Sequence, residues 1–281
     1  MSRSSSSSTQ LNSQAWWPQE GWTSILVHNY GGRRKKDVHN ASIRDLLVKF
    51  PAHIFVLQEH DPRILHANDH NDFHVCLALD ENNDETGLCV LARKVDTSTG
   101  NPCISAVNML ASHTIVCKGN CTPVMVVECL LPHGASLIIV NTHFHHNTAK
   151  RVSGHARAYT TVLDLYAELI KKHKAHLLIG DFNQAAPHMV SELQARLPMD
   201  VYSDSHHPTF EDCICIFGLG SKAPGRHSDI SVWKHLNGAH WPLVMHFGSV
   251  PRRTDAKKNE RKRKGYERWA TAKAKAKARH S

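Results

Sequence analysis

Short apolar runs recur along the chain and are separated by more polar segments. They occupy residues 24–28, 54–57, 88–91, 124–127, 137–140, 177–179, 230–233 and 243–247. Several are rich in Val and Ile. Short runs of this kind, bounded by polar segments, are typical of strands buried in a core. The pattern therefore predicts eight core strands.

Two segments have the spacing of an amphipathic helix. Apolar side chains at positions i, i+3, i+4 and i+7 predict a helix over 43–50 that ends before Pro51. A second helix is predicted over 153–173, with Val162, Leu165 and Leu169 on its apolar face. Strands and helices do not alternate regularly, which favours an α/β fold in which two sheets pack face to face with the helices outside.

The basic charge is concentrated at the end of the chain. Residues 251–281 contain 13 of the 34 Lys and Arg residues and 3 of the 25 Asp and Glu residues. We expect a disordered Ser/Gln-rich segment over 1–20, one domain over 21–249 and a basic, flexible tail over 250–281. A basic run at Arg261, Lys262, Arg263 and Lys264 fits polyanion binding or nuclear import, and it fits a solvated tail without a partner as well.

Composition argues against a membrane protein and against classical secretion. No run approaches the roughly 18 apolar residues that a membrane helix needs, and the serine-rich N-terminus lacks the apolar segment of a secretion signal. Several of the eight cysteines lie within apolar runs, as buried thiols of a reducing compartment do. We therefore expect an intracellular protein, and its basic tail is compatible with a nuclear one.

Polar residues that can bind a metal or move protons stand next to the predicted strands. Those that follow a strand are Asn29, Glu59, His143, Asp181 and Asn183; Asp229 precedes one, and His240 opens the last. Taken singly, each has an ordinary explanation as a turn former or a solvated group. Their order along the chain is the more specific signal.

This series resembles the endonuclease/exonuclease/phosphatase superfamily. The matching segments are Asn29, Gln58-Glu59, Asn141-Thr-His143, Gly180-Asp-Phe-Asn183, Asp229 and His240-Trp-Pro242, spread over residues 21–248. The resemblance implies a four-layered α/β sandwich with two mixed β-sheets and an active site at one end of both sheets. It also implies hydrolysis of phosphate esters.

The resemblance assigns a role to each of these residues. Glu59, with Asn29 beside it, would bind Mg²⁺, or Mn²⁺, because such cations prefer hard oxygen ligands. Asp181 would orient the attacking water, and Asn183 and His143 would contact the phosphate. His240 would act as an acid, a base or a charge-stabilising group, with Asp229 accepting a hydrogen bond from its ring.

One position departs from the family pattern. The chain has Ala239 before His240, where the family usually has an aspartate that helps to hold the metal or its water shell. The main hypothesis is a Mg²⁺-dependent nuclease acting on DNA or RNA, since the tail and a basic loop at Arg33 and Arg34 favour a polyanionic polymer. The alternatives are a non-catalytic nucleic-acid-binding protein and a small-molecule phosphatase, for example of inositol phosphates.

Two further expectations concern partners and zinc. We expect a monomer whose partner is nucleic acid. Histidines at 143, 145, 146, 206 and 207 suggest a zinc cluster by composition, but they lack the spacing of known zinc motifs.

Overall fold

The computed structural model describes most of the region between the two ends of the chain. The described residues are 22–29, 47, 50, 52–60, 69–80, 83–96, 100–132, 134–151, 153–198, 200–203, 214–219, 231–232 and 243–248. The segments 1–20 and 250–281, for which we predict disorder and flexibility, lie outside the described residues.

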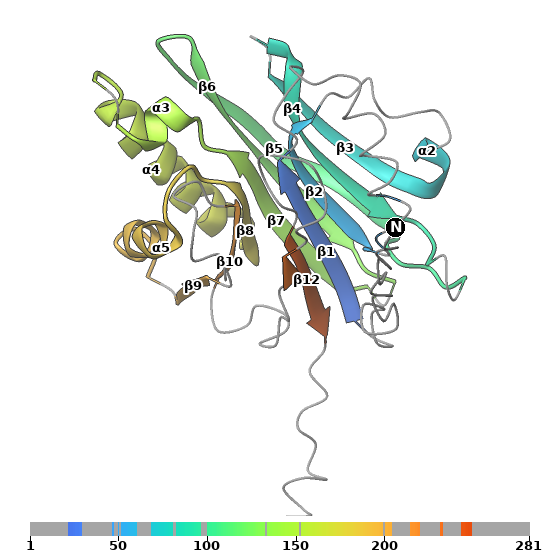
Figure 1. Cartoon of the computed structure of the whole chain (residues 1–281). Coiled ribbons are helices and arrows are strands. Elements are labelled where there is room, and N and C mark those ends of the chain that lie inside the picture. The colour runs from blue at the N-terminus through green and yellow to red at the C-terminus, as the bar shows by residue number, and fades with distance from the viewer. Residues whose placement is uncertain are drawn as a thin grey trace, which may run out of the picture.

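The described strands form two six-stranded sheets (Figure 1). In spatial order, the first sheet contains β11 (Ser231–Val232), β12 (Leu243–Gly248), β1 (Trp22–Asn29), β2 (Ile54–His60), β4 (Asn83–Arg93) and β3 (Phe73–Asp80). The second contains β5 (Ala106–Cys117), β6 (Asn120–Leu130), β7 (Ser136–His143), β8 (Leu177–Asp181), β10 (Ile214–Leu219) and β9 (Val201–Ser203). Both sheets are mixed, because β1 and β2 are parallel, as are β7 and β8, whereas the other pairs are antiparallel.

Helices cover the outer face of the second sheet. They are α3 (His146–Ala149), α4 (Ala156–His173) and α5 (Ala186–Gln194), while α2 (Asp69–Asp72) precedes β3 in the first sheet (Figure 1). The apolar face of α4 packs on the sheet through Val162, Leu163, Tyr166 and their neighbours. After the last residue of α4, Lys174 has a left-handed backbone, and its N–H caps the helix by donating to the carbonyl of Ile170.

Alternation of side chains along the strands divides the core into three clusters. On β2, Ile54 and Val56 face the other sheet, whereas Phe55 and Leu57 face the outer side of the first sheet. On β6, Met125 and Val127 join the cluster between the sheets, and Val124 and Val126 pack under the helices. Successive side chains of a strand point to opposite faces, so an uninterrupted apolar run supplies two clusters at once.

The structure confirms the predicted fold class, the eight predicted strands and the second predicted helix. That helix begins at Ala156 and ends at His173, within the predicted 153–173. Of the helix predicted over 43–50, only Leu47 and Phe50 are described; both are buried against the outer side of the first sheet. No helix within the described ranges is both long enough and apolar enough to cross a membrane.

Candidate active site

The carboxyl ends of four strands meet at one end of the sandwich, the upper end in Figure 1. Parallel pairing places Asn29 of β1 beside Gln58 of β2, and His143 of β7 beside Asp181 of β8. Across the interface between the sheets, β1 and β2 contact β8, and β2 also contacts β7. Five of the predicted site residues, namely Asn29, Glu59, His143, Asp181 and Asn183, lie at this end.

The first link between the sheets joins Glu59 to His143. The Nε2 atom of His143 lies 3.1 Å from Oε1 of Glu59, and the two side chains are 15% and 23% exposed. Alternation along β2 would turn Glu59 away from the other sheet, because Val56 and Gln58 already face it. The pairing of β2 with β4 shifts register between Leu57 and His60, and Glu59 has a left-handed φ of 49°. This bulge aims the carboxylate at the second sheet.

The second link joins Asn29 to Asp181. Asn29 donates through Nδ2 to Oδ2 of Asp181 over 2.7 Å, and the backbone N–H of Asn183 donates to Oδ1 over 3.0 Å. The Asp181 side chain is fully buried. Asn183 has a left-handed φ of 48°, which asparagine tolerates better than most residues, and its own side chain donates to the carbonyl of Phe144. Both carboxylate oxygens of Asp181 are therefore held by donors of fixed direction.

A buried amide pair lies beneath these contacts. Gln58 donates through Nε2 to Oδ1 of Asn141 over 2.8 Å, and Asn141 donates through Nδ2 to the carbonyls of Leu57 and Cys89. Both side chains have no exposed surface. The pair joins the two sheets one residue before Glu59 and two residues before His143.

Close packing of β7 on β8 sets the position of Asp181. A Cβ atom at Gly180 would collide with the carbonyl oxygen of Thr142. The two strands can therefore lie this close together only because residue 180 is glycine. Thr142 donates its hydroxyl proton to the carbonyl of Pro123, so the Tyr166 hydroxyl must donate to Thr142. The hydroxyl bond thereby attaches α4 to β7 on the side away from the candidate site.

His145 lies beside the site, after β7. Its Nδ1 accepts a hydrogen bond from the backbone N–H of Asn147 and so caps α3. Burial, followed by the neighbouring histidines His143, His146 and His155, lowers the pKa of His145 to about 4. At neutral pH the ring is therefore uncharged.

The donor set at this end fits a hard divalent cation. Glu59 supplies a carboxylate and Asn29 an amide oxygen, and the two residues lie at the ends of neighbouring parallel strands. The partial exposure of Glu59 leaves its carboxylate within reach of an ion from solvent. Oxygen ligands of this kind suit Mg²⁺ or Mn²⁺ better than zinc.

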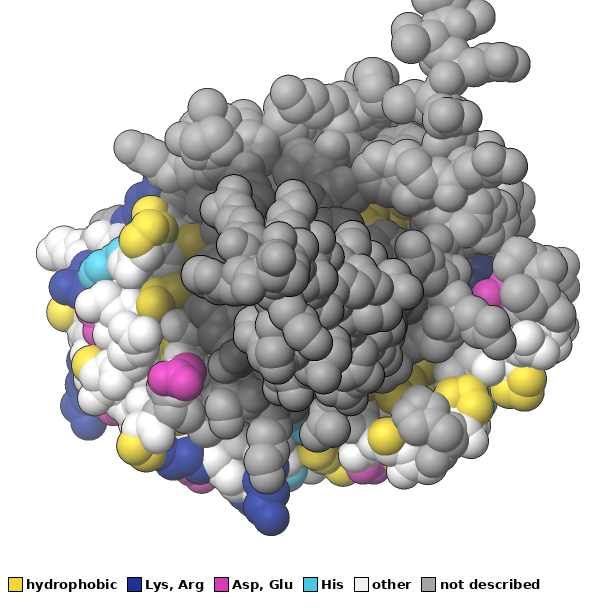
Figure 2. Space-filling view, turned by 90° about the horizontal axis from the view of Figure 1, so that it is seen from below, with side chains coloured by type: hydrophobic (Ala, Val, Ile, Leu, Met, Phe, Trp, Pro, Cys, Tyr) yellow, Lys and Arg dark blue, Asp and Glu magenta, His cyan; other side chains and the backbone are white. Residues whose placement is uncertain are grey.

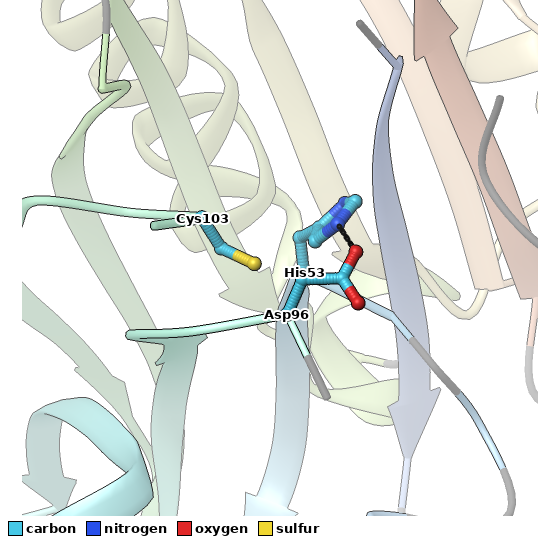
Figure 3. Close-up of side chains that lie close together, drawn as sticks. All are labelled: His53, Asp96 and Cys103. Carbon is cyan, nitrogen blue, oxygen red and sulfur yellow. Dashed lines mark ion pairs between the residues drawn. The ribbon is translucent and has the colours of Figure 1, made fainter. Parts of the chain in front are cut away.

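A second cluster of ligand-type side chains lies elsewhere, at the start of β2. His53, Asp96 and Cys103 place one ligand atom each within 4.8 Å of the others (Figure 3). However, Nδ1 of His53 accepts the backbone N–H of Ser24 over 3.0 Å, so the proton of the neutral ring must be on Nε2, which faces Asp96 at 3.6 Å. Burial also raises the pKa of the Cys103 thiol to about 11. Neither group is in the state that binds a metal, which favours a structural role.

Several other predicted residues belong to segments outside the described part of the chain. Asp229, His240 and the departure at Ala239 lie outside the described residues, and so do the predicted nucleic-acid contacts, which are Arg33, Arg34, Arg261, Lys262, Arg263 and Lys264. The candidate zinc histidines at 206–207 lie outside them as well. Figure 2 views the molecule from below, away from the candidate site, and its described side chains mix hydrophobic, basic and acidic kinds.

Solved structures resemble this chain in fold but not closely in sequence. TDP2 of D. rerio, solved with a single-strand DNA product, is 14% identical over 82% of this chain and 100% of its own, with a TM-score of 0.57. The human Nocturnin catalytic domain with bound sulfate is 14% identical over 81% and 93%, with a TM-score of 0.53. An endonuclease/exonuclease/phosphatase family protein from Bacteroides thetaiotaomicron is 12% identical over 82% and 98%, with a TM-score of 0.51.

No protein-family model matches the chain, and no curated protein matches it in sequence. The structural similarity nevertheless covers about four-fifths of the chain and nearly the whole of each of these three neighbours. The chain therefore has the fold of the endonuclease/exonuclease/phosphatase superfamily, as its resemblance in sequence predicts.

Proposed function

We propose that this protein is a Mg²⁺-dependent phosphodiesterase, and specifically a nuclease that acts on DNA or RNA. The observation that carries the proposal is the pair of links between the sheets, Glu59 with His143 and Asn29 with Asp181, at the end where four strands terminate. Each link joins an oxygen donor suited to a cation with a group able to act on a phosphate or a water molecule.

The residues divide the chemistry of phosphodiester hydrolysis among them. Glu59 and Asn29 would hold the cation, whose charge, when bound, offsets that of the phosphate. Asp181 would orient the attacking water, because its buried carboxylate is already fixed by two donors. His143 and Asn183 would donate to phosphate oxygens as negative charge grows there. Asp229 and His240 keep the roles that the resemblance in sequence implies.

Two features support nucleic acid as the substrate. The basic run at 261–264 suits a phosphate backbone, and the similar TDP2 structure holds a single-strand DNA product. The same basic run supports action in the nucleus. A polymer with many phosphates gains from several weak contacts at once, whereas a small phosphate ester does not.

A cleavage assay tests the proposal. Labelled single- and double-stranded DNA and RNA are incubated with the full chain in Mg²⁺, Mn²⁺ or EDTA, alongside Glu59→Gln, Asp181→Asn and His240→Ala. We expect metal-dependent cleavage that falls at least about 100-fold in each variant, as loss of an acid, base or charge-stabilising group does. Glu168→Gln, a change on the exposed side of α4, is the control and should cleave normally.

Ala239 favours one alternative, a protein that keeps the fold and binds nucleic acid without cutting it. Binding that is equal in EDTA and Mg²⁺, with no cleavage of any polymer, would establish that alternative. Cleavage that survives EDTA or Asp181→Asn contradicts the proposed site. If the protein neither cuts nor binds nucleic acid, turnover of inositol phosphates and other phosphomonoesters becomes the test of a phosphatase.

A further inference from the structure

Glu59 has a backbone conformation that is unfavourable for a residue other than glycine. It is a non-glycine residue with φ at 49°, at the point where β2 shifts register against β4. A left-handed backbone at such a residue costs free energy and persists only where the surroundings fix it. In a regular extended strand the Glu59 side chain would follow Leu57 toward the outer side of the first sheet, away from His143.

The amide pair next to Glu59 has only one self-consistent orientation. The Nδ2 atom of Asn141 is identified by the two backbone carbonyls that accept from it, those of Leu57 and Cys89 at 3.2 and 3.4 Å. Its oxygen must then accept from Gln58, so Nε2 of Gln58 is the donor over 2.8 Å. The same Nε2 lies 3.4 Å from the carbonyl of Val56. Three bonds thus tie Asn141 in the second sheet to residues 57, 58 and 89 in the first.

The remaining atom of the pair is unusual. The Oε1 atom of Gln58 is buried and has no hydrogen-bond partner among the described residues. A buried acceptor without a protein partner calls for a specific explanation. Gln58 directly precedes the candidate metal ligand Glu59, so this acceptor lies beside the candidate site.

We infer that Gln58 and Asn141 are positioning residues for the candidate metal ligand Glu59. Their bond holds the last regular residue of β2 against the second sheet, so that the strained turn at Glu59 aims its carboxylate at His143 and at a bound cation. This inference rests on the proposed function. It adds that cation affinity depends on two fully buried side chains that do not themselves touch the ion.

Gln58→Met in the full chain tests the inference. Methionine has a similar length and fills the buried space but cannot donate to Asn141. Mn²⁺ binding, measured by electron paramagnetic resonance without substrate, should weaken about 10- to 100-fold, as it does when a residue behind a metal ligand is lost. The Mg²⁺ concentration for half-maximal cleavage should rise by a similar factor, whereas kcat at saturating Mg²⁺ should change much less.

A second variant and a control keep the test decisive. Gln58→Asn shortens the side chain by one methylene and keeps an amide, so it reports on the contact even if Gln58→Met does not fold. Tyr166→Phe also deletes a buried hydrogen bond to β7, through Thr142, but leaves Gln58, Asn141 and Glu59 unchanged. Its Mn²⁺ affinity should stay within about twofold of the original chain's.

The outcomes separate the inference from the proposed function. Folded Gln58 variants that bind Mn²⁺ as well as the original chain overturn the positioning role and leave the proposed function standing. An original chain that neither binds Mn²⁺ nor cleaves any substrate overturns the proposed function itself. Weakened binding in the Gln58 variants, with normal binding in Tyr166→Phe, supports both.

Discussion

At the scale of single residues, His145 shows how its surroundings set the charge of a side chain. Its Nδ1 can accept the N–H of Asn147 only while that nitrogen carries no proton. Burial and three neighbouring histidines act in the same direction and lower the pKa of His145 to about 4. The segment after β7 therefore keeps its helix cap throughout the neutral pH range.

The lowered pKa predicts how stability depends on pH. Above pH 6.5 the His145 ring is neutral in both the folded and the unfolded chain, and its contribution to stability is complete. Between pH 6.5 and about 4 the unfolded chain takes up a proton that the folded chain does not, so the free energy of unfolding falls. His145→Asn keeps an N-cap acceptor and removes this titration, so its stability should fall less over that window.

Denaturant unfolding at several pH values measures this difference. Half-buried His176 also has a lowered pKa and is present in both proteins, so only the difference between them reports on His145. An NMR resonance of the His145 ring that titrates near pH 6.5 in the folded chain would contradict the prediction.

Two polar site residues lie on the same strand faces as the apolar core residues that precede them. On β1, Ile25 and Val27 face the second sheet and Asn29 follows them; on β8, Leu177 and Ile179 precede Asp181 in the same way. Apolar runs followed by a polar residue are visible in the sequence, which is why the sequence could indicate that these polar residues lie at one end of the sheets. The direction of Glu59 could not be predicted, because it depends on a bulge and a left-handed backbone that the residue type does not reveal.

At the scale of elements, the pairing of β7 with β8 depends on one glycine. The absence of a side chain at Gly180 lets the two strands approach at Thr142, and Asp181 is the next residue. Gly180→Ala should therefore lower the free energy of unfolding by about 3 kcal/mol or more, in the range of severe overpacking. It should also displace Asp181 and reduce the proposed activity.

Thermal and denaturant unfolding check this prediction. Gly134→Asn is the control. A Cβ atom at Gly134 would meet no other atom within 4 Å, so this substitution causes no collision. The backbone there has a left-handed φ of 83°, which asparagine tolerates better than most residues. Gly134→Asn should cost less than about 1 kcal/mol. A Gly180→Ala protein as stable as this control would show that β7 and β8 can separate freely.

The sequence analysis does not predict four of the described strands, namely β3, β5, β9 and β10. Short apolar runs are present in β3, at residues 75–79, and in β10, at residues 214–217, whereas β5 lacks an uninterrupted one. The strand β5 extends over Ala106–Cys117, but as an edge strand it exposes polar and apolar side chains together, including Asn108, Met109 and Val116. Its pairing with β6 also shifts register between Met109 and Ala111, which disturbs any period of two. The eight predicted strands could be found because neighbours on both faces of a buried strand require apolar residues.

At the scale of the whole molecule, apolar packing and charge are distributed differently along the chain. Among the described residues, the cluster between the sheets is apolar over most of its length, and the polar side chains of Gln58, Asn141 and Asp181 lie at one end of it. By contrast, the net basic charge lies in residues 251–281, and the rest of the chain is nearly neutral. In the proposed function, the folded domain therefore carries out the chemistry, and the tail supplies the long-range attraction for a polyanion.

This separation predicts that the tail charges govern salt dependence and not the chemical step. Replacing Arg261, Lys262, Arg263 and Lys264 by glutamine in the full chain should raise KM on a long nucleic acid. If all four contact phosphates, the slope of log affinity against log salt should become shallower by about 3, since each contact contributes roughly 0.7 to 0.9. The kcat on a short oligonucleotide should stay the same, because the tail supplies affinity.

Binding and steady-state cleavage at several salt concentrations measure both quantities, with Lys171→Gln and Lys172→Gln in the last turn of α4 as the control for a general loss of charge. An unchanged slope in the tail variant would assign nucleic-acid affinity to the folded domain alone.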